Sequence, residues 1–551
     1  MEINGQRARC ADDMTPYIRI SFCDVNRLQL TENEPSQAKP PESYNPFEKR
    51  IVEHPNSFTS QRITHKLNIV LLSAMSVLEA LLFLIHSVPL LSDTGSLVHL
   101  LKCSLGTGIL AMPHAFRNAG LVFGTVVTVL VGLVCTHCIH ILVRSSQILC
   151  LREKIPVLTF AETAEVAFKS GPTQLKKLAQ VSKQFVNVAL CATCYSTSCV
   201  YIVFVATSIK QVTDHYYQAG TADDAKINIR LYILMIFPFV CALGLIRNLK
   251  YLVPVSAIAN LLMGVGFTIT FYYIFTGVPS PTQRDYVASP GLMPMFFCTV
   301  IFAMEGIGVV SEPANRRTSK TYKREKYHIK SSRRCGSKAR LDIVSKADRE
   351  KQLHNVMPLE NSMKNPGHFL GCPGVLNAGM FVVVTLYAII GFFGYLKYGE
   401  STNASVTLNL PSEHAMAQVV KILIAVAILF TYGLQFFIAT DITWPMLEKH
   451  VDKRWSSTLQ NLYRILTVAI TVCVAIAVPN LGPIISLVGA VCYSTLGLLC
   501  PVMIDLVTNW EGGLGTWYWV LWKDSFIILF WLAALLTGTY TSVLDIITMY
   551  S

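Results

Sequence analysis

Apolar segments of membrane-spanning length recur along this chain, with short polar stretches between them. About 20 apolar residues in a helix cross the ~30 Å hydrocarbon core of a bilayer, where only helices and closed barrels satisfy every backbone polar group. The sequence therefore predicts an all-α polytopic membrane protein. Eleven transmembrane helices are expected, at residues 96–118, 121–143, 183–209, 229–246, 252–277, 289–310 continued by 357–363, 374–396, 416–440, 460–478, 481–507 and 521–546.

The composition agrees with this assignment. Of the 551 residues, 52% are hydrophobic and 15% are charged, and the mean hydropathy is +0.45. A typical soluble domain has about 25% charged residues. The sequence contains no nucleotide-binding loop and no complete catalytic constellation, which argues against an ATP-driven pump and against an enzyme. No cofactor, metal or nucleic-acid site is predicted.

Basic residues in the connecting loops predict the topology, because Lys and Arg accumulate in loops that stay in the cytosol. If segment 96–118 enters the membrane from the cytosol, the inner loops hold thirteen Lys and Arg and the outer loops hold six. This bias predicts a cytosolic N-terminal tail and an outward C-terminus. The sequon at Asn403 then falls in an outer loop, as glycosylation requires.

Two regions outside the eleven segments need separate interpretation. Residues 1–65 are polar, contain prolines and lack a signal-peptide pattern, which predicts a disordered cytosolic tail. Residues 66–92 form an extra apolar segment that carries the polar residues Asn68, Glu79 and His86. Whether this segment crosses the membrane stays open, because a twelfth span would move the tail to the other side.

Glycines interrupt the first and the sixth of the eleven segments. The first contains Gly106-Thr107-Gly108, followed by Pro113, and the sixth contains Gly306 and Gly308. Broken helices in matching places of two five-helix halves are typical of secondary transporters, since unwound backbone in mid-membrane offers free N–H and C=O groups to a solute. The pattern predicts a solute carrier.

Residues 311–356 interrupt the sixth segment with a strongly basic stretch. They hold fourteen Lys and Arg against five acidic residues, a difference of +9 out of the net +12 of the whole chain. Each Lys or Arg at the centre of a bilayer costs about 2.5 to 3.5 kcal/mol. We therefore expect this insert to loop out of the membrane into water.

Several long motifs occur in an order that resembles one known family. They are His99–Pro113, Phe302–Val310, Met357–Pro366, Gly371–Gly374 and, in the tail, Tyr44–Pro55. In these motifs, and over most of 93–546, the chain resembles the proton-coupled amino acid transporters of the amino acid/auxin permease family. The resemblance implies a transporter domain over 93–551 with a LeuT-like 5+5 inverted repeat, in which helices 1 and 6 are broken.

The same resemblance marks 66–92 and 311–356 as insertions, because relatives run almost directly across both places. One or both are hypothesised to be retained introns or gene-model errors. Val310-Ser311 can be encoded by GTG-AGT, which reads as a splice donor. If the insert is present in the protein, we expect it to disrupt or to regulate the unwound site.

An amino acid substrate carries a carboxylate and an ammonium group, and both need partners when they are buried. Unwinding of the first helix frees amide groups and directs a positive helix end at the carboxylate, while freed carbonyls of the sixth helix receive the ammonium. The predicted substrate-binding residues are Gly106, Thr107, Gly108, Ile109, Phe302, Ala303, Gly306 and Gly308. The alternative is that these glycines only pack helices together.

Two ionisable residues are predicted to couple a proton to transport. His99 lies about two turns before the first break, and an imidazole binds and releases a proton near neutral pH. The resemblance aligns it with a first-helix histidine implicated in coupling. Glu305 directly precedes the second break, and intramembrane carboxylates are functional candidates. The alternatives are a packing role for His99 and a structural pair of Glu305 with Lys102.

These observations predict a secondary active transporter that moves small neutral amino acids of the alanine, glycine and proline class by alternating access. The predicted coupling ion is a proton, with sodium left open, and the membrane is the plasma membrane or a lysosomal or late endosomal membrane. Two alternatives remain, an amino acid sensor that signals through a growth-control kinase complex and a non-functional splice product. The cluster Cys135, His137, Cys138 and His140 is interpreted as packing, because these side chains do not share one helical face.

Overall fold

The computed structural model describes residues 101, 104, 106–155, 158–218, 227–304, 370, 374–452, 454–510 and 516–550. All structural statements below concern these residues. The predicted tail 1–65, the extra segment 66–92 and the basic insert 311–356 lie outside them. Every regular element in the described residues is helical, which confirms the all-α class.

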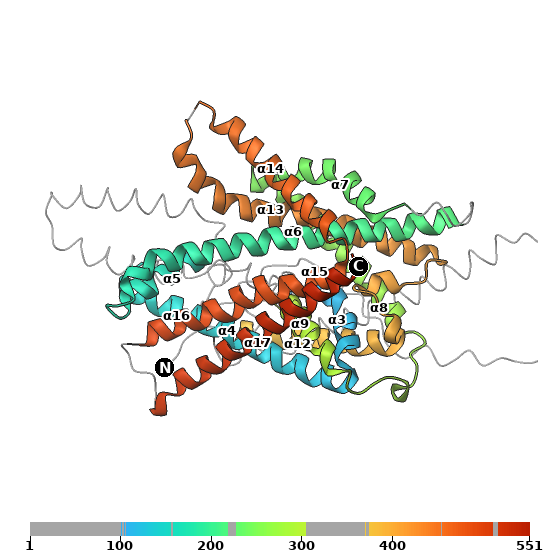
Figure 1. The fold of residues 1–551 in the computed structure, drawn as a ribbon, viewed down its shortest axis with the longest axis horizontal. Coiled ribbons are helices and arrows are strands. Elements are labelled where there is room, and N and C mark those ends of the chain that lie inside the picture. The colour runs from blue at the N-terminus through green and yellow to red at the C-terminus, as the bar shows by residue number, and fades with distance from the viewer. Residues whose placement is uncertain are drawn as a thin grey trace, which may run out of the picture. The chain divides into compact units, whose positions relative to one another are not determined.

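Each of the eleven predicted segments coincides with at least one helix (Figure 1). The principal helices are α3 (Thr107–Ala119), α4 (Leu121–Glu153), α5 (Phe160–Ser170), α6 (Ala179–Gln218), α7 (Ile229–Gly244), α8 (Leu249–Phe275), α9 (Met293–Met304), α12 (Val375–Tyr398), α13 (Ala415–Leu447), α14 (Ser456–Ala477), α15 (Leu481–Val488), α16 (Cys500–Asn509) and α17 (Trp519–Thr548). By length and composition, eight helical stretches of the described chain can cross a membrane, and α7 and α9 are shorter apolar helices. This pattern confirms a multi-pass membrane protein.

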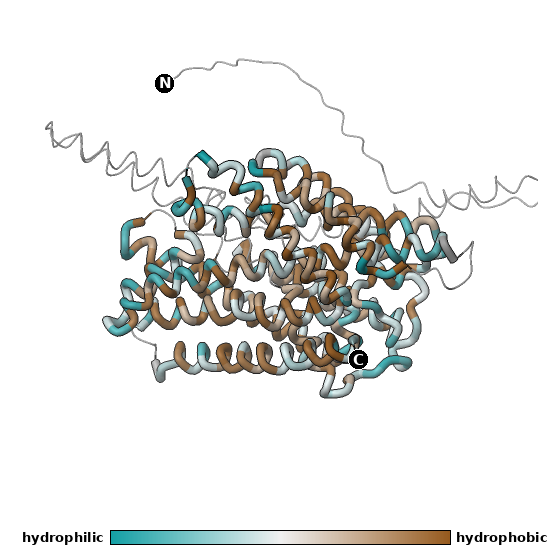
Figure 2. Tube along the Cα trace, turned by 45° about the horizontal axis from the view of Figure 1, so that its top comes forward, coloured by the Kyte–Doolittle hydropathy of each residue, from teal (hydrophilic) through white to brown (hydrophobic). Residues whose placement is uncertain are grey.

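Apolar surface covers the outside of the helices as well as the core. Figure 2 shows hydrophobic residues along most of the helix lengths, with hydrophilic residues gathered near the helix ends. Large apolar side chains are exposed on α4, α8, α12 and α17, among them Leu133, Leu261, Phe381 and Leu529. Apolar surface of this extent is typical of helices that face lipid rather than water.

Helix α3, which carries the first predicted break, packs against both α9 and α12. Glycines of α12 allow the close approach. A side chain at Gly391 would overlap the ring of Phe116, and one at Gly394 would overlap Pro113. This packing fixes α3 beside α9, so that the first and sixth predicted segments lie next to each other.

The tenth predicted segment differs from the regular helix that was expected over 481–507. Helix α15 continues into two five-residue π-helical turns, η12 (Gly489–Tyr493) and η13 (Thr495–Leu499), and then into α16. The first of these turns packs closely against α9, because a side chain at Gly489 would overlap the carbonyl of Cys298. Such π-helical turns are rare and occur frequently at functional sites.

The sequence analysis also missed α5, a short amphipathic helix between α4 and α6. It begins with a capping box, in which the Thr159 side chain accepts from the Glu162 amide at 3.2 Å and the Thr159 amide donates to Glu162 at 3.1 Å. The Thr-x-x-Glu pattern was readable in the sequence. A helix of eleven residues is too short for a search based on membrane-spanning length.

Candidate amino acid binding site

The first helix is interrupted at Gly106. Residues Leu101 and Ser104 are helical, Gly106 has φ −122° and ψ −147°, and α3 begins at Thr107. The Gly106 amide donates to the Ser104 carbonyl at 2.9 Å, and no side chain caps the start of α3. The first amides of a helix have no partner within the helix. The interruption therefore leaves N–H groups of Thr107, Gly108 and Ile109 directed away from α3 at its N-terminal end.

The carbonyl on the other side of the break has a partner from another helix. The buried hydroxyl of Tyr387 on α12 donates to the Ser104 carbonyl at 2.5 Å. The Tyr201 hydroxyl of α6 forms a side-chain hydrogen bond with Thr107. Sequence analysis named neither tyrosine, although a tyrosine inside an apolar segment needs a partner for its hydroxyl when it is buried.

The predicted residues of the sixth helix lie directly against this break. A Cβ atom added to Gly108 would lie 2.6 Å from Cα and 3.1 Å from the carbonyl oxygen of Ala303 on α9. Only glycine allows the two backbones to approach so closely. The structure thus brings together Gly108 and Ala303, which are far apart in the sequence, and Ile109, Phe302 and Ala303 are all buried.

Phe302 continues the contact from α9 to the π-helical part of the tenth segment. Its ring packs edge-on against Tyr493 with centroids 5.3 Å apart, and the Tyr493 hydroxyl lies 3.0 Å from the Thr197 hydroxyl of α6. This contact could not be read from the sequence, because it joins helices that are far apart in the chain. Phe302 and Tyr493 form an aromatic wall beside the break.

Charge is absent from the described parts of α3 and α9 that meet here. The first turn of α3 has no acidic residue, and α9 has no charged residue from Met293 to Met304. The positive end of the α3 dipole is therefore not neutralised by a neighbouring carboxylate within these two helices. The arrangement suits a small anionic group such as a carboxylate.

Several predicted site residues cannot be placed relative to this contact. His99, Glu305, Gly306 and Gly308 lie outside the described residues. The glycosylation candidate Asn403 is exposed in the segment between α12 and α13. Among the residues that the structure describes, no group of three His, Cys, Asp or Glu side chains converges on a possible metal position.

A comparison with known families decides the class of the protein. The family described as transmembrane amino acid transporter protein matches residues 92–317 and 352–544. The chain belongs to this family. The part of this transmembrane amino acid transporter that matches the family does not include residues 318–351, which lie inside the basic insert.

Individual relatives of the transporter cover most of its length. It is 40% identical over 462 residues to "Proton-coupled amino acid transporter-like protein pathetic" of Drosophila melanogaster. The aligned region covers 84% of this chain and 86% of that protein. It is 24% identical over 480 residues to "Vacuolar amino acid transporter 4" of Saccharomyces cerevisiae, covering 81% of this chain and 57% of that protein. The solved structure of MhsT in complex with L-phenylalanine is 12% identical, with a TM-score of 0.40 over 82% of this chain and 98% of MhsT.

Proposed function

We propose that this amino acid transporter is a secondary active carrier that moves small neutral amino acids together with a proton by alternating access. The observation that carries the proposal is the contact of Gly108 with Ala303 beside the free helix end at Gly106. In this proposal helices 1 and 6 belong to the two halves of a LeuT-like inverted repeat. Their movement against each other exposes the site to one side of the membrane at a time.

The substrate carboxylate binds at the amides of Thr107, Gly108 and Ile109, beside Gly106, whose own amide donates to the Ser104 carbonyl at 2.9 Å. These groups lie at the positive end of α3, where no side-chain cap and no acidic residue compete for them. Carbonyls near Phe302 and Ala303 receive the ammonium group, and Gly306 and Gly308 open the sixth helix further. Gly108 is required because a side chain would separate α3 from α9.

The preference for neutral amino acids follows from the surroundings of the break. The described neighbours of the Gly108 contact, such as Ile109, Phe302 and Tyr493, are apolar or hydroxyl-bearing. A charged substrate side chain would be desolvated there without an ionic partner, at a cost that neutral side chains avoid. Alanine, glycine and proline are the substrates proposed, because their side chains carry no charge.

The coupling ion is proposed to be a proton, carried by His99 and Glu305. Support comes from the 40% identical relative, whose name includes proton coupling. The proton enters from the cell exterior at the plasma membrane or from the lumen of a lysosome or late endosome. Either place supplies an acidic side toward which the predicted topology directs the outer loops.

Uptake into proteoliposomes tests this function. We expect labelled alanine, glycine and proline to accumulate faster at acidic than at neutral outside pH, without a requirement for sodium. His99→Ala removes the acid stimulation because the imidazole no longer carries the proton. His450→Ala, which changes an exposed histidine outside the predicted site, is the matched control and retains the stimulation.

Two results would contradict the proposal. Uptake that requires sodium and whose rate does not depend on pH would exclude proton coupling. Binding of amino acids without any flux across the membrane would favour a sensor over a carrier.

A further inference from the structure

Three charged residues meet between α16 and α17, away from the contact of α3 with α9. Lys523 lies 3.0 Å from Asp505 and 3.1 Å from Asp524, measured between the ammonium nitrogen and one oxygen of each carboxylate. Asp505 is 5% exposed and Asp524 is fully buried. With both carboxylates ionised, this charge cluster carries one uncompensated negative charge, and buried charges without a partner are costly.

The two carboxylates are not equivalent. Asp505 accepts from the Ser145 hydroxyl at 3.2 Å, from the Asn509 amide at 2.7 Å and from Lys523 at 3.0 Å. Asp524 contacts the same lysine at 3.1 Å, and no other described residue donates a hydrogen bond to its oxygens. Hydrogen bonds to a carboxylate favour its ionised form. The excess charge is therefore least stabilised on Asp524.

The described residues of α9, α15 and α16, which pack on α17, supply no basic group that could neutralise Asp524. The described parts of α9 and α15, which also pack on α17, contain no acidic or basic residue. Asp505 is the only ionisable acidic or basic residue of α16. Helix α4 contributes His137, which faces Lys523 and Asp505, and Arg152, which donates to the Thr508 carbonyl at 3.0 Å.

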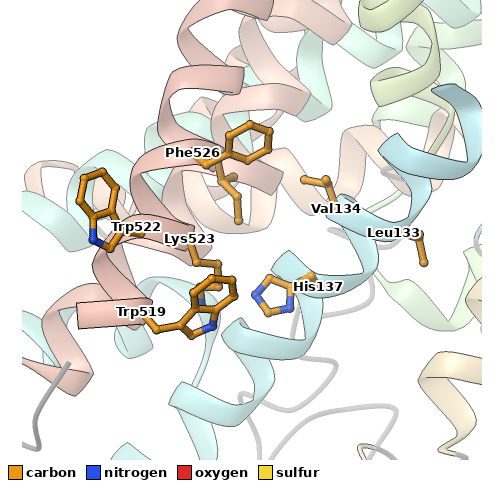
Figure 3. Close-up of a pocket in the computed structure, with 8 residues that line it drawn as sticks. Leu133, Val134, His137, Trp519, Trp522, Lys523 and Phe526 are labelled. Atoms are coloured by element: carbon orange, nitrogen blue, oxygen red, sulfur yellow. The ribbon is translucent and has the colours of Figure 1, made fainter. Parts of the chain in front are cut away.

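An open, mostly apolar groove of about 410 Å³ between α4 and α17 reaches one member of the charge cluster, Lys523. Figure 3 shows His137 of α4 across this groove from Lys523 and Trp519 of α17. The His137 Nε2 atom is buried and has no hydrogen-bond partner among the described residues. In the predicted topology the groove and this end of α17 lie at the cytosolic side of the membrane.

We propose that Asp524 is a proton-binding site, which takes up H⁺ from the cytosolic side to form a neutral carboxylic acid beside the fixed pair of Asp505 and Lys523. A proton fits better than a metal cation, because the Lys523 ammonium already occupies the space between the carboxylates and repels a second cation. Protonation leaves one positive and one negative charge, so the cluster becomes neutral. The role in transport rests on the proposed function, whereas the proton binding does not.

Infrared difference titration of the purified full-length transporter, without substrate, tests the proton binding directly. We expect a carboxylic acid band to appear between neutral and acidic pH in the wild type and to be lost in Asp524→Asn. Asp545→Asn, which removes an exposed carboxylate from the other end of α17, is the matched control and retains the band. An unchanged band in Asp524→Asn would overturn the proposal.

Thermal unfolding at neutral pH separates a proton site from a structural ion cluster. Because Asp524→Asn removes the uncompensated charge without changing shape, we expect its Tm to be at least that of the wild type. A clear decrease in Tm would show that the ionised carboxylate stabilises the fold and would contradict the proposal.

The contribution to transport is measured in proteoliposomes as amino acid uptake at a series of internal pH values. We expect the wild-type rate to vary with internal pH, and this variation to be lost in Asp524→Asn but kept in Asp545→Asn. Persistence of the wild-type profile in Asp524→Asn would overturn the role in coupling. Absence of any wild-type uptake would instead contradict the proposed function, and the infrared band would still decide on proton binding.

Discussion

Gly108→Ala is expected to reduce amino acid uptake by about fivefold or more, because overpacking of a close contact costs about 1 to 3 kcal/mol. The added Cβ would lie 2.6 Å from Cα of Ala303, so backbone rather than a flexible side-chain end has to move. Separation of α3 from α9 also displaces the free amides beside Gly106 from the carbonyls near Ala303. Uptake of labelled alanine into proteoliposomes, normalised to reconstituted protein, measures the effect.

Gly264→Ala is the matched control for this substitution. Gly264 lies within the helix α8, is exposed, and has no atom within 4 Å of the position of an added Cβ. Alanine there is expected to leave uptake unchanged, since it also favours helix over glycine. Wild-type uptake by Gly108→Ala would show that the close approach of the two backbones is not required for transport.

Deletion of residues 311–356 is expected to raise the rate of amino acid uptake above that of the full chain. The insert separates the sixth predicted segment from its continuation at 357–363 and places a net charge of +9 next to the proposed substrate site. The match to the transporter family omits 318–351. We propose that the uninterrupted sixth segment is the form that binds substrate most readily.

The comparison needs a variant that separates charge from length. A neutral Gly/Ser linker of the same length in place of 311–356 tests whether the basic residues or the interruption itself lowers uptake. Equal uptake by the full chain and the deletion variant would contradict the prediction.

Sequencing of transcripts across codons 305–362 tests whether the insert is a retained intron. A uniform message that keeps the whole insert would exclude a retained intron.

The positions of the helices could be predicted from the sequence because membrane-spanning length and apolar composition are local properties. The interruption at Gly106 was also readable, since glycines in an apolar segment are local signals. The predicted boundaries of the helices were less accurate where a helix has polar ends. Helices α4, α6 and α13 extend well beyond the predicted segments, because their ends leave the hydrocarbon without ending the helix.

The partners of the break could not be read from the sequence. Tyr387 binds the Ser104 carbonyl only because α12 packs against α3, and Tyr493 meets Phe302 only because the tenth segment contains π-helical turns. Such contacts join residues that are far apart in the chain and follow no spacing rule. The pair of Lys523 and Asp505 could not be predicted for the same reason, because the two residues belong to different helices.

A structure determined with bound alanine, on a chain that lacks 311–356, tests the central claim most directly. We expect the substrate carboxylate within hydrogen-bonding distance of the amides at Thr107, Gly108 or Ile109, and the ammonium group near the carbonyls of Phe302 or Ala303. Alanine bound elsewhere, or a first helix that runs unbroken through Gly106, would contradict the account.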